Sequence, residues 1–281
     1  MYPAKFDYYR ASSVAEAVSL LQEHDDAKVL AGGHSLIPMM KLRLAQPPVL
    51  IDLGQLSELR GISRSNDGGV RIGAMTTYAE IANADTGLGA LTDACAIIGD
   101  RQVRNRGTIG GNLAHNDPAG DLPAVALALG AQMEAVGADG TRTISADDFI
   151  VDLLETDLKE DEVLTSISFP ASGSSAYAKF ENPASGYAIC GVAAMVELAD
   201  DGTVSNCTVA VNGASDYAQR LSEVEDALTG QAATSENIAA AAAGAGEGLE
   251  FLSDIHADEA YRAHLTKVLT RRALEEAVAR A

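Results

Sequence analysis

The stretches VLAGGHSLIPMMKLR at 29–43 and RGTIGGNLAHNDPAGD at 106–121 share one pattern: two adjacent glycines stand between an apolar run and a polar residue. Glycine is favoured where the backbone takes a positive φ or where another group must approach it closely. Consecutive backbone N–H groups in such a turn can form a concavity that binds an anion. One such pair alone is more often a tight connection between a strand and a helix. Two similar turns in one chain favour a shared task, the binding of a pyrophosphate between them.

The composition limits the classes of partner. The chain has 281 residues, 47% of them hydrophobic, which suffices for a large core or two domains. Its formal net charge is −20, so nucleic-acid phosphates and anionic membrane surfaces would be repelled. We therefore expect no nucleic-acid partner, and we interpret the acidity mainly as an aid to solubility.

The sequence also bears on location and metal content. The start, MYPAKFDYYRASS, lacks the apolar segment of a signal peptide, and no run reaches the roughly 18 apolar residues of a membrane span. Cys95, Cys190 and Cys207 are far apart and show no CxxC spacing. We expect a cytoplasmic chain with no membrane span, no metal site and no iron–sulfur cluster of its own.

Local patterns divide the chain into three parts. Residues 1–54 read as a small α/β unit, with a helix at 12–24 whose Ser13 and Glu16 form a capping-box pattern. Residues 55–172 form a second unit, in which Pro123 stands in the first turn of a helix, a position that tolerates it. The small-residue stretch PASGSSA at 170–176 is the candidate linker. From 173 to 281 we expect three antiparallel strands, AYAKF, AICGVAAMVELA and TVSNCTVAVNGA, followed by helices.

Standard nucleotide motifs are absent. The chain contains neither GxGxxG after a strand nor GxxxxGK[ST], which speaks against a Rossmann dinucleotide site and a P-loop. Arg101, Arg104 and Arg106 form a basic island just before the second glycine turn. They can supply positive potential, although surface ion pairs are the commoner use of such residues.

Together the two stretches resemble a known family. AGGHSLIPMMKLRLAQPPVLIDL with RNRGTIGGNLAHNDPAGDLPAVALALGA is similar to the FAD-binding medium subunit of molybdenum hydroxylases, which include carbon monoxide and xanthine dehydrogenases. The resemblance extends over nearly the whole chain. It implies an α+β fold in which two FAD-binding subdomains of the PCMH type, 1–54 and 55–172, precede a C-terminal domain of the carbon monoxide dehydrogenase flavoprotein type at 173–281.

The resemblance also implies which residues contact noncovalent FAD. They are Ala31, Gly32, Gly33, His34, Ser35, Leu36 and Ile37 in the first turn, Ile98, Thr108, Ile109, Gly110, Gly111 and Asn112 at the second, and Asp121, Leu164, Lys179 and Tyr187 beyond it. Valine at Gly110 or Gly111 is expected to abolish binding, because a β-branched side chain resists positive φ and would block the pyrophosphate.

Several of these residues have plain structural alternatives. Ile98 and Leu164 suit a core, Asp121 suits the N-cap of the helix after it, and Lys179 suits a solvated strand. Tyr187 can equally be an ordinary edge aromatic. His115 has no evident task beyond structure.

The implied function is electron transfer within an oxidoreductase. The chain has no catalytic acid–base or nucleophile set of its own, and in the family a molybdopterin site on a large subunit oxidises the substrate. Electrons cross [2Fe-2S] clusters of a small iron–sulfur subunit to FAD, which passes them to NAD, a quinone or another acceptor. We expect a dimer of heterotrimers. Two alternatives stay open: a stand-alone flavin oxidase with FAD attached through His34, and a flavin-free assembly subunit.

Overall fold

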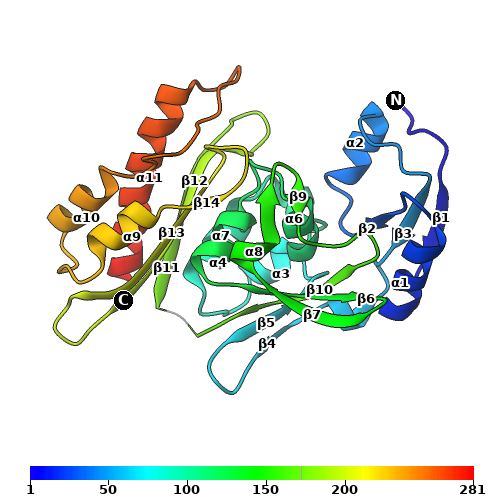
Figure 1. The fold of residues 1–281 in the computed structure, drawn as a ribbon, viewed down its shortest axis with the longest axis horizontal. Coiled ribbons are helices and arrows are strands. Elements are labelled where there is room, and N and C mark those ends of the chain that lie inside the picture. The colour runs from blue at the N-terminus through cyan, green and yellow to red at the C-terminus, as the bar shows by residue number, and fades with distance from the viewer. Residues whose placement is uncertain (172) are drawn as a thin grey trace.

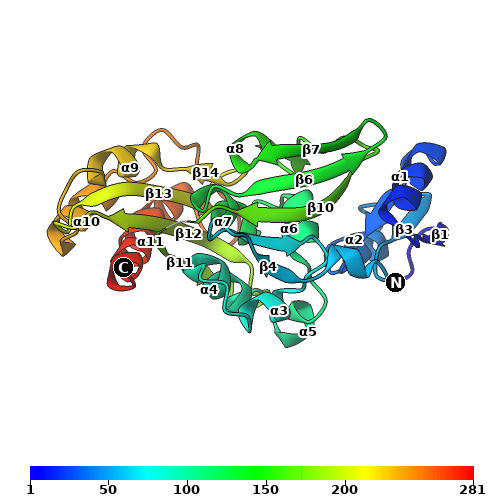
Figure 2. The same cartoon turned by 90° about the horizontal axis from the view of Figure 1, so that it is seen from below.

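Three larger β-sheets follow one another along the long axis of the molecule, with helices between and around them (Figures 1 and 2), and the hairpin β8–β9 forms a separate two-stranded sheet among the described residues. The computed structural model describes residues 1–171 and 173–281. The mixture of helices and sheets agrees with the expected α+β class.

The N-terminal unit is a three-stranded parallel sheet with two helices. Its elements are β1 (Asp7–Arg10), α1 (Val14–Glu23), β2 (Lys28–Leu30), α2 (Leu36–Leu42) and β3 (Val49–Asp52), and the strand order is β1-β3-β2. The helix predicted at 12–24 corresponds to α1, whereas β1 was not expected, because its four residues are all exposed and show no apolar alternation. The first glycine turn connects β2 to α2.

Only half of the predicted capping box is present at α1. The Ser13 side chain accepts a hydrogen bond from the Glu16 backbone N–H at 3.1 Å, as expected. The Glu16 carboxylate, however, accepts from the backbone N–H of Ser12 at 2.7 Å and from the Ser12 hydroxyl. Ser12 offers two donors to the Glu16 carboxylate, and it therefore takes the place of the N-cap residue Ser13 as the partner of that carboxylate.

The central unit is a five-stranded antiparallel sheet of order β4-β5-β10-β6-β7. Its elements are η1 (Ser57–Leu59), β4 (Ile62–Arg64), β5 (Val70–Gly73), α3 (Tyr78–Ala82), α4 (Gly89–Ile97), α5 (Arg101–Arg104), α6 (Ile109–His115), α7 (Leu122–Ala128), β6 (Gln132–Gly137), β7 (Gly140–Ser145), α8 (Ala146–Phe149), β8 (Ile150–Asp152), β9 (Glu155–Thr156) and β10 (Val163–Phe169). The second glycine turn leads from α5 into α6. The short hairpin β8–β9 was not expected from the sequence.

The C-terminal unit is an antiparallel sheet of order β11-β12-β13-β14. Its elements are β11 (Ser174–Glu181), β12 (Ala188–Leu198), β13 (Val204–Asn212), β14 (Gln219–Arg220), α9 (Ser222–Leu228), α10 (Ser235–Ala242) and α11 (Glu259–Ala279). The three predicted strands are present, and β14 adds a fourth of only two residues. The predicted linker at 170–176 includes Ser172, which lies outside the described residues, while residues 174–176 already belong to β11 because they pair with β12. The boundary at 172 remains a prediction.

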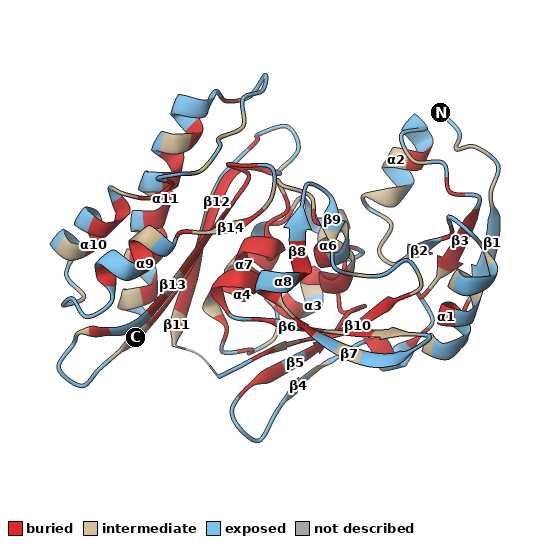
Figure 3. Ribbon diagram, in the orientation of Figure 1, coloured by how far each residue is buried: buried red, intermediate tan, exposed pale blue. Residues whose placement is uncertain are grey.

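Helices α4 and α7 lie between the central and C-terminal sheets, and α9, α10 and α11 cover the opposite face of the latter (Figure 1). Every residue of α7 is buried, which Figure 3 shows as a continuous red helix. One hydrophobic cluster contains residues of α4 and α7 together with Tyr177 and Met195 of the C-terminal sheet. The shared core fixes how these two units are positioned.

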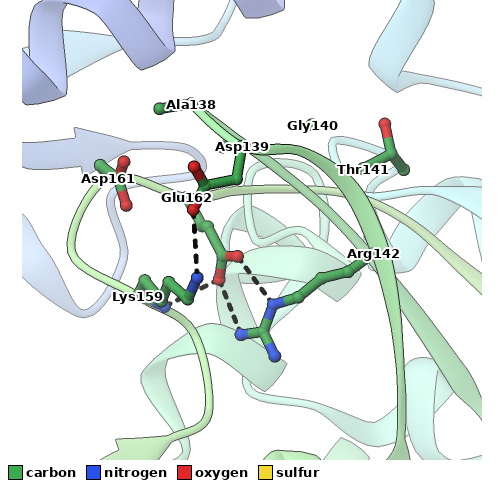
Figure 4. Close-up of a pocket in the computed structure, with 9 residues that line it drawn as sticks. Ala138, Asp139, Gly140, Thr141, Arg142, Lys159, Asp161 and Glu162 are labelled. Atoms are coloured by element: carbon green, nitrogen blue, oxygen red, sulfur yellow. Dashed lines mark hydrogen bonds and ion pairs between the residues drawn. The ribbon is translucent and has the colours of Figure 1, made fainter.

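A cluster of ion pairs connects the β6–β7 hairpin to the segment before β10 (Figure 4). Arg142 donates from Nε and Nη2 to the two oxygens of Glu162 at 2.7 and 2.8 Å, and its Nη1 lies 2.5 Å from Asp157 Oδ2. The Glu162 side chain is largely buried, and the hydrogen bond from Arg142 lowers its pKa, although burial opposes the shift. We interpret this cluster, which lines a small pocket, as structural.

This cluster predicts a pH dependence of stability. Because the pKa of Glu162 is depressed in the folded chain, its contribution to stability is present above the unfolded pKa and is lost as pH falls through the folded pKa. We expect the free energy of unfolding of Glu162→Gln to fall less steeply than wild type between about pH 5 and pH 3. Urea titrations across this range measure both slopes, and parallel slopes would contradict the prediction.

Candidate functional site

The first glycine turn leaves a run of backbone donors unused. Gly33 has φ of +76°, a conformation that side chains rarely adopt. In the part of the chain that the structure describes, the backbone N–H groups of residues 33–36 have no hydrogen-bond acceptor, and the first regular bond comes from Ile37 N–H to Gly33 O at 3.1 Å. Four successive unpaired amides form a site that suits an anion.

The second glycine turn differs from the first. The N–H groups of Ile109 and Gly110 donate to the carbonyls of Thr76 and Ala74 at 3.1 and 2.9 Å. The N–H of Gly111 donates to the Thr108 hydroxyl, which caps α6. Gly110 and Gly111 are helical, so the expectation of positive φ in this turn was wrong. The sequence pattern could not show that neighbouring carbonyls already use these amides.

The glycines allow the two turns to touch each other. A Cβ on Gly32 would lie 2.2 Å from the Arg106 carbonyl oxygen and 2.9 Å from the Gly107 Cα, so no side chain fits there. A Cβ on Gly110 would lie 2.5 Å from the Ala74 Cβ, which explains this glycine by protein packing. Close backbone contact therefore joins the N-terminal unit to the central one at the site.

Asn112 presents an unsatisfied oxygen at this junction. Its Nδ2 donates to the Tyr78 hydroxyl at 3.1 Å, whereas its Oδ1 is buried without a partner among the described residues. Leaving a buried acceptor unpaired costs about 1–3 kcal/mol. A ligand hydroxyl would satisfy it, so the atom marks a position suited to a donor.

A buried ion pair connects the central unit to the C-terminal sheet. Lys179 Nζ lies 3.1 Å from Asp121 Oδ1, and the two side chains are only 1% and 4% exposed. Asp121 precedes α7 at the N-cap position, but its side chain makes no capping bond. Burial raises the pKa of Asp121, and the charge of Lys179 opposes the rise. The capping and solvated-strand alternatives for these two residues are thus absent from the structure.

Tyr177 and Asn212 extend this pair into a network that the sequence analysis missed. The Tyr177 hydroxyl lies 2.6 Å from Asp121 Oδ1 and 3.0 Å from Asn212 Oδ1, and all three residues are buried. Asn212 Nδ2 has no partner among the described residues. The sequence could have indicated Tyr177, because it lies two residues before Lys179 on one strand and the two side chains therefore share a face of the sheet.

Lys179 also holds the turn that carries Tyr187. Its Nζ donates to the carbonyl oxygens of Gly186 at 2.9 Å and Ile97 at 3.3 Å. Burial raises the pKa of Tyr187, the charge of Asp117 adds to the rise, and a hydrogen bond with the Ser35 side chain opposes it. Tyr187 is partly exposed and lies beside the first glycine turn.

The remaining predicted residues lie in two environments. Ile98, Ile109 and Leu164 belong to the buried central cluster, which places their side chains in the core. His34 is exposed, with Nδ1 3.2 Å from the Gly32 carbonyl. Of the other first-turn residues, Leu36 contributes one of the unpaired amides, while Ala31 and Ile37 lie just before and after the run in sequence.

The basic island before the second turn is not explained by ion pairs. Arg104 donates to the carbonyl oxygens of Ile98 and Gly99 at 3.2 and 2.9 Å, so its role here is structural. Arg101 and Arg106 are exposed. None of the three forms a salt bridge with another described residue.

The described residues contain neither a reactive thiol nor a group of side chains that could bind a metal. Cys95, Cys190 and Cys207 are buried free thiols, and burial raises the pKa of Cys190 and of Cys207 to about 12, which suppresses the reactive thiolate. No group of His, Cys, Asp or Glu among residues 1–171 and 173–281 could hold a metal ion. In the same part of the chain, no helix is long and apolar enough to cross a membrane.

Two glycine turns in contact, together with a sheet domain that adds an aromatic residue and a lysine, are features of a flavin-binding protein. Comparison with known families agrees. Residues 4–172 match the FAD binding domain in molybdopterin dehydrogenase, and residues 175–277 match the CO dehydrogenase flavoprotein C-terminal domain. The chain therefore belongs to the family of FAD-binding medium subunits of molybdenum hydroxylases.

Individual relatives cover essentially the whole chain. The nicotine 6-hydroxylase medium subunit of Paenarthrobacter nicotinovorans is 39% identical over 97% of both chains. The carbon monoxide dehydrogenase medium chain of Hydrogenophaga pseudoflava is 40% identical over 100% of this chain and 99% of its own. A solved structure of carbon monoxide dehydrogenase from the latter organism matches with a TM-score of 0.95 at 40% identity, over 100% of both chains. The chain is an oxidoreductase subunit with FAD as its cofactor, whereas the molybdopterin and iron–sulfur centres of this family lie on other subunits.

Proposed function

We propose that this chain holds one noncovalent FAD and relays electrons from the iron–sulfur clusters of a small partner subunit to an external acceptor. The observation that carries the proposal is the run of four unpaired amides at residues 33–36, directly beside the second turn. Backbone donors in that number can bind a pyrophosphate without a lysine. When bound, FAD supplies the redox chemistry, and the chain orients it.

The two turns would contribute differently to the cofactor site. The first turn supplies backbone N–H groups, with the Ser35 side chain beside them. The second supplies the Thr108 hydroxyl and Asn112, whose buried Oδ1 suits a hydroxyl donor such as those of the ribityl chain. Lys179 and Asp121 hold the Tyr187 turn, so that the ring can cover the flavin. Ile98, Ile109 and Leu164 would act mainly by closing the core behind it.

The proposed partnership rests on the family, whose molybdopterin and iron–sulfur centres lie on other subunits. Substrate oxidation requires the molybdopterin of a large subunit, and delivery of electrons requires the [2Fe-2S] clusters of a small one. Stable complexes of this kind commonly bury more than about 2,000 Å². We propose a heterotrimer, duplicated by a two-fold axis and located in the cytoplasm.

The purified complex tests this function by its absorption spectrum and by acid precipitation. We expect flavin bands corresponding to one FAD per chain, and release of that flavin into the acid supernatant. Metal analysis of the same preparation should find molybdenum and iron. Flavin that stays with the acid pellet would favour covalent attachment through His34, and a spectrum without flavin bands would favour an assembly subunit.

A further inference from the structure

A row of three residues across the C-terminal sheet leaves a space beside Lys179. Lys179 of β11 pairs with Gly191 of β12, and Gly191 pairs with Asn212 of β13. Residues directly opposite each other in a sheet share a face, so the row carries a cation, a position without a side chain, and an amide. This face packs against α4 and α7 of the central unit (Figure 1). Gly191 therefore leaves room beside a buried charge.

The Tyr177 hydroxyl occupies the room above Gly191. A Cβ on Gly191 would lie 2.0 Å from the Tyr177 hydroxyl oxygen and 2.6 Å from Asn212 Oδ1. Gly191 does not have a positive φ, so this position requires glycine for space and not for its backbone conformation. Any larger residue at 191 would displace the hydroxyl.

The position of the hydroxyl determines which oxygen receives its proton. A tyrosine hydroxyl has one proton to donate, and two buried oxygens lie within reach, Asp121 Oδ1 at 2.6 Å and Asn212 Oδ1 at 3.0 Å. The carboxylate is both nearer and charged, so it receives the proton. Asp121 Oδ1 thus has two partners on β11, the Tyr177 hydroxyl and the Lys179 ammonium group 3.1 Å away.

The surroundings of Asp121 make this hydrogen bond important for its ionisation. Burial raises the pKa of Asp121, whereas the charge of Lys179 and the hydrogen bond from Tyr177 oppose the rise. The negative charge of Glu181 adds to it. Three further groups near Asp121 stay uncharged because burial raises their pKa values: Tyr78, Cys95 and Tyr187. Without the hydroxyl, Asp121 would take up a proton at a higher pH.

We infer that Tyr177, seated over Gly191, is a positioning residue of the flavin site. Its hydroxyl holds the Asp121 carboxylate against Lys179, and Lys179 donates to the Gly186 carbonyl in the turn that carries Tyr187. Tyr177 is itself buried, and it acts on the cofactor through this pair. The inference rests on the proposed function, because it requires that the Tyr187 turn cover bound FAD.

The pH dependence of FAD binding to the assembled complex tests this role. Dissociation constants are measured between about pH 8.5 and pH 5.5 from the fluorescence of FAD released on dilution, for wild type, Tyr177→Phe and Tyr217→Phe. Tyr217→Phe is the matched control. Tyr217 is partly buried against the same hydrophobic cluster, and its hydroxyl makes no hydrogen bond with another described residue.

We expect the three proteins to bind FAD almost equally near the alkaline end, which also shows that the variants fold. As pH falls, Asp121 takes up a proton and Lys179 loses its counter-charge, so FAD affinity declines. In Tyr177→Phe this decline should begin about one pH unit higher than in wild type and the control. At the acidic end its dissociation constant should then be about 10-fold above theirs.

Gly191→Ala is an independent second variant. Its Cβ would displace the hydroxyl, so it should shift the pH dependence in the same direction as Tyr177→Phe. In the double variant no hydroxyl remains to be displaced. Its dissociation constant should therefore be no higher than that of the weaker-binding single variant.

Three outcomes would overturn the inference. A loss of affinity in Tyr177→Phe that is the same at every pH would indicate packing alone. Wild-type affinity at every pH would show that the hydroxyl is not needed, and additive losses in the double variant would show that Gly191 acts independently of it. Failure of the proposed function would appear separately, as a wild-type complex without flavin absorption.

Discussion

Gly32→Ala is expected to release most of the flavin from the complex and to lower the melting temperature by about 5 °C or more. The added Cβ would lie 2.2 Å from the Arg106 carbonyl oxygen, which is backbone and cannot rotate away. The two glycine turns must then separate, and the unpaired amides of the first turn move away from Asn112. Flavin absorbance per chain and thermal unfolding of the purified complex measure both effects.

Gly244→Ala is the matched control for this substitution. Gly244 also lacks a positive φ, and its Cβ would meet nothing closer than 3.6 Å. We expect full flavin content and a melting temperature close to wild type. If Gly32→Ala behaved like the control, contact between the two turns would not be needed to form the site.

Lys179→Met should destabilise the chain by about 3–5 kcal/mol, since it leaves the Asp121 carboxylate buried without its counter-charge. The substitution also frees the Gly186 carbonyl and thereby loosens the Tyr187 turn. We therefore expect weaker flavin binding in addition to the lower free energy of unfolding. Urea titration and the dissociation constant of FAD measure the two losses independently.

The double variant Lys179→Met with Asp121→Leu distinguishes charge from packing. Replacing both members of a buried pair by apolar residues is often neutral, so stability should return to within about 1–2 kcal/mol of wild type. Flavin binding should stay weak, because the Gly186 carbonyl still lacks the hydrogen bond from Lys179 that steadies the Tyr187 turn. A single variant as stable as wild type would contradict the interpretation of the pair.

Strong local patterns predicted most of the secondary structure. The uninterrupted apolar run of β12 and Pro123 at the start of α7 are examples in which neighbouring residues decide the conformation. The two-residue strands β9 and β14 carry no periodicity. Their pairing depends on distant groups, such as the Asn116 amide that holds the β8–β9 hairpin, and local sequence does not encode those groups.

The candidate site was predictable to a similar extent. Both glycine turns were recognisable from sequence, but the sequence did not show that only the first turn has unpaired backbone amides. Whether an amide is free depends on carbonyls elsewhere, such as those of Ala74 and Thr76, which occupy the donors of the second turn. The pairing of Asp121 with Lys179 joins residues 58 positions apart, and only the resemblance to a known family put both in one site.

The contact of Gly32 with the Arg106–Gly107 backbone has a thermodynamic consequence. The N-terminal unit supplies the unpaired amides and the central unit supplies Asn112, so cofactor binding and docking of the two units form one linked equilibrium. At a free FAD concentration 100 times its dissociation constant, that linkage would add about 2.7 kcal/mol to folding. Chains made when flavin is scarce would lose this increment and open more often at the junction, where proteases can act. The supply of flavin would then set the lifetime of the polypeptide as well as its activity.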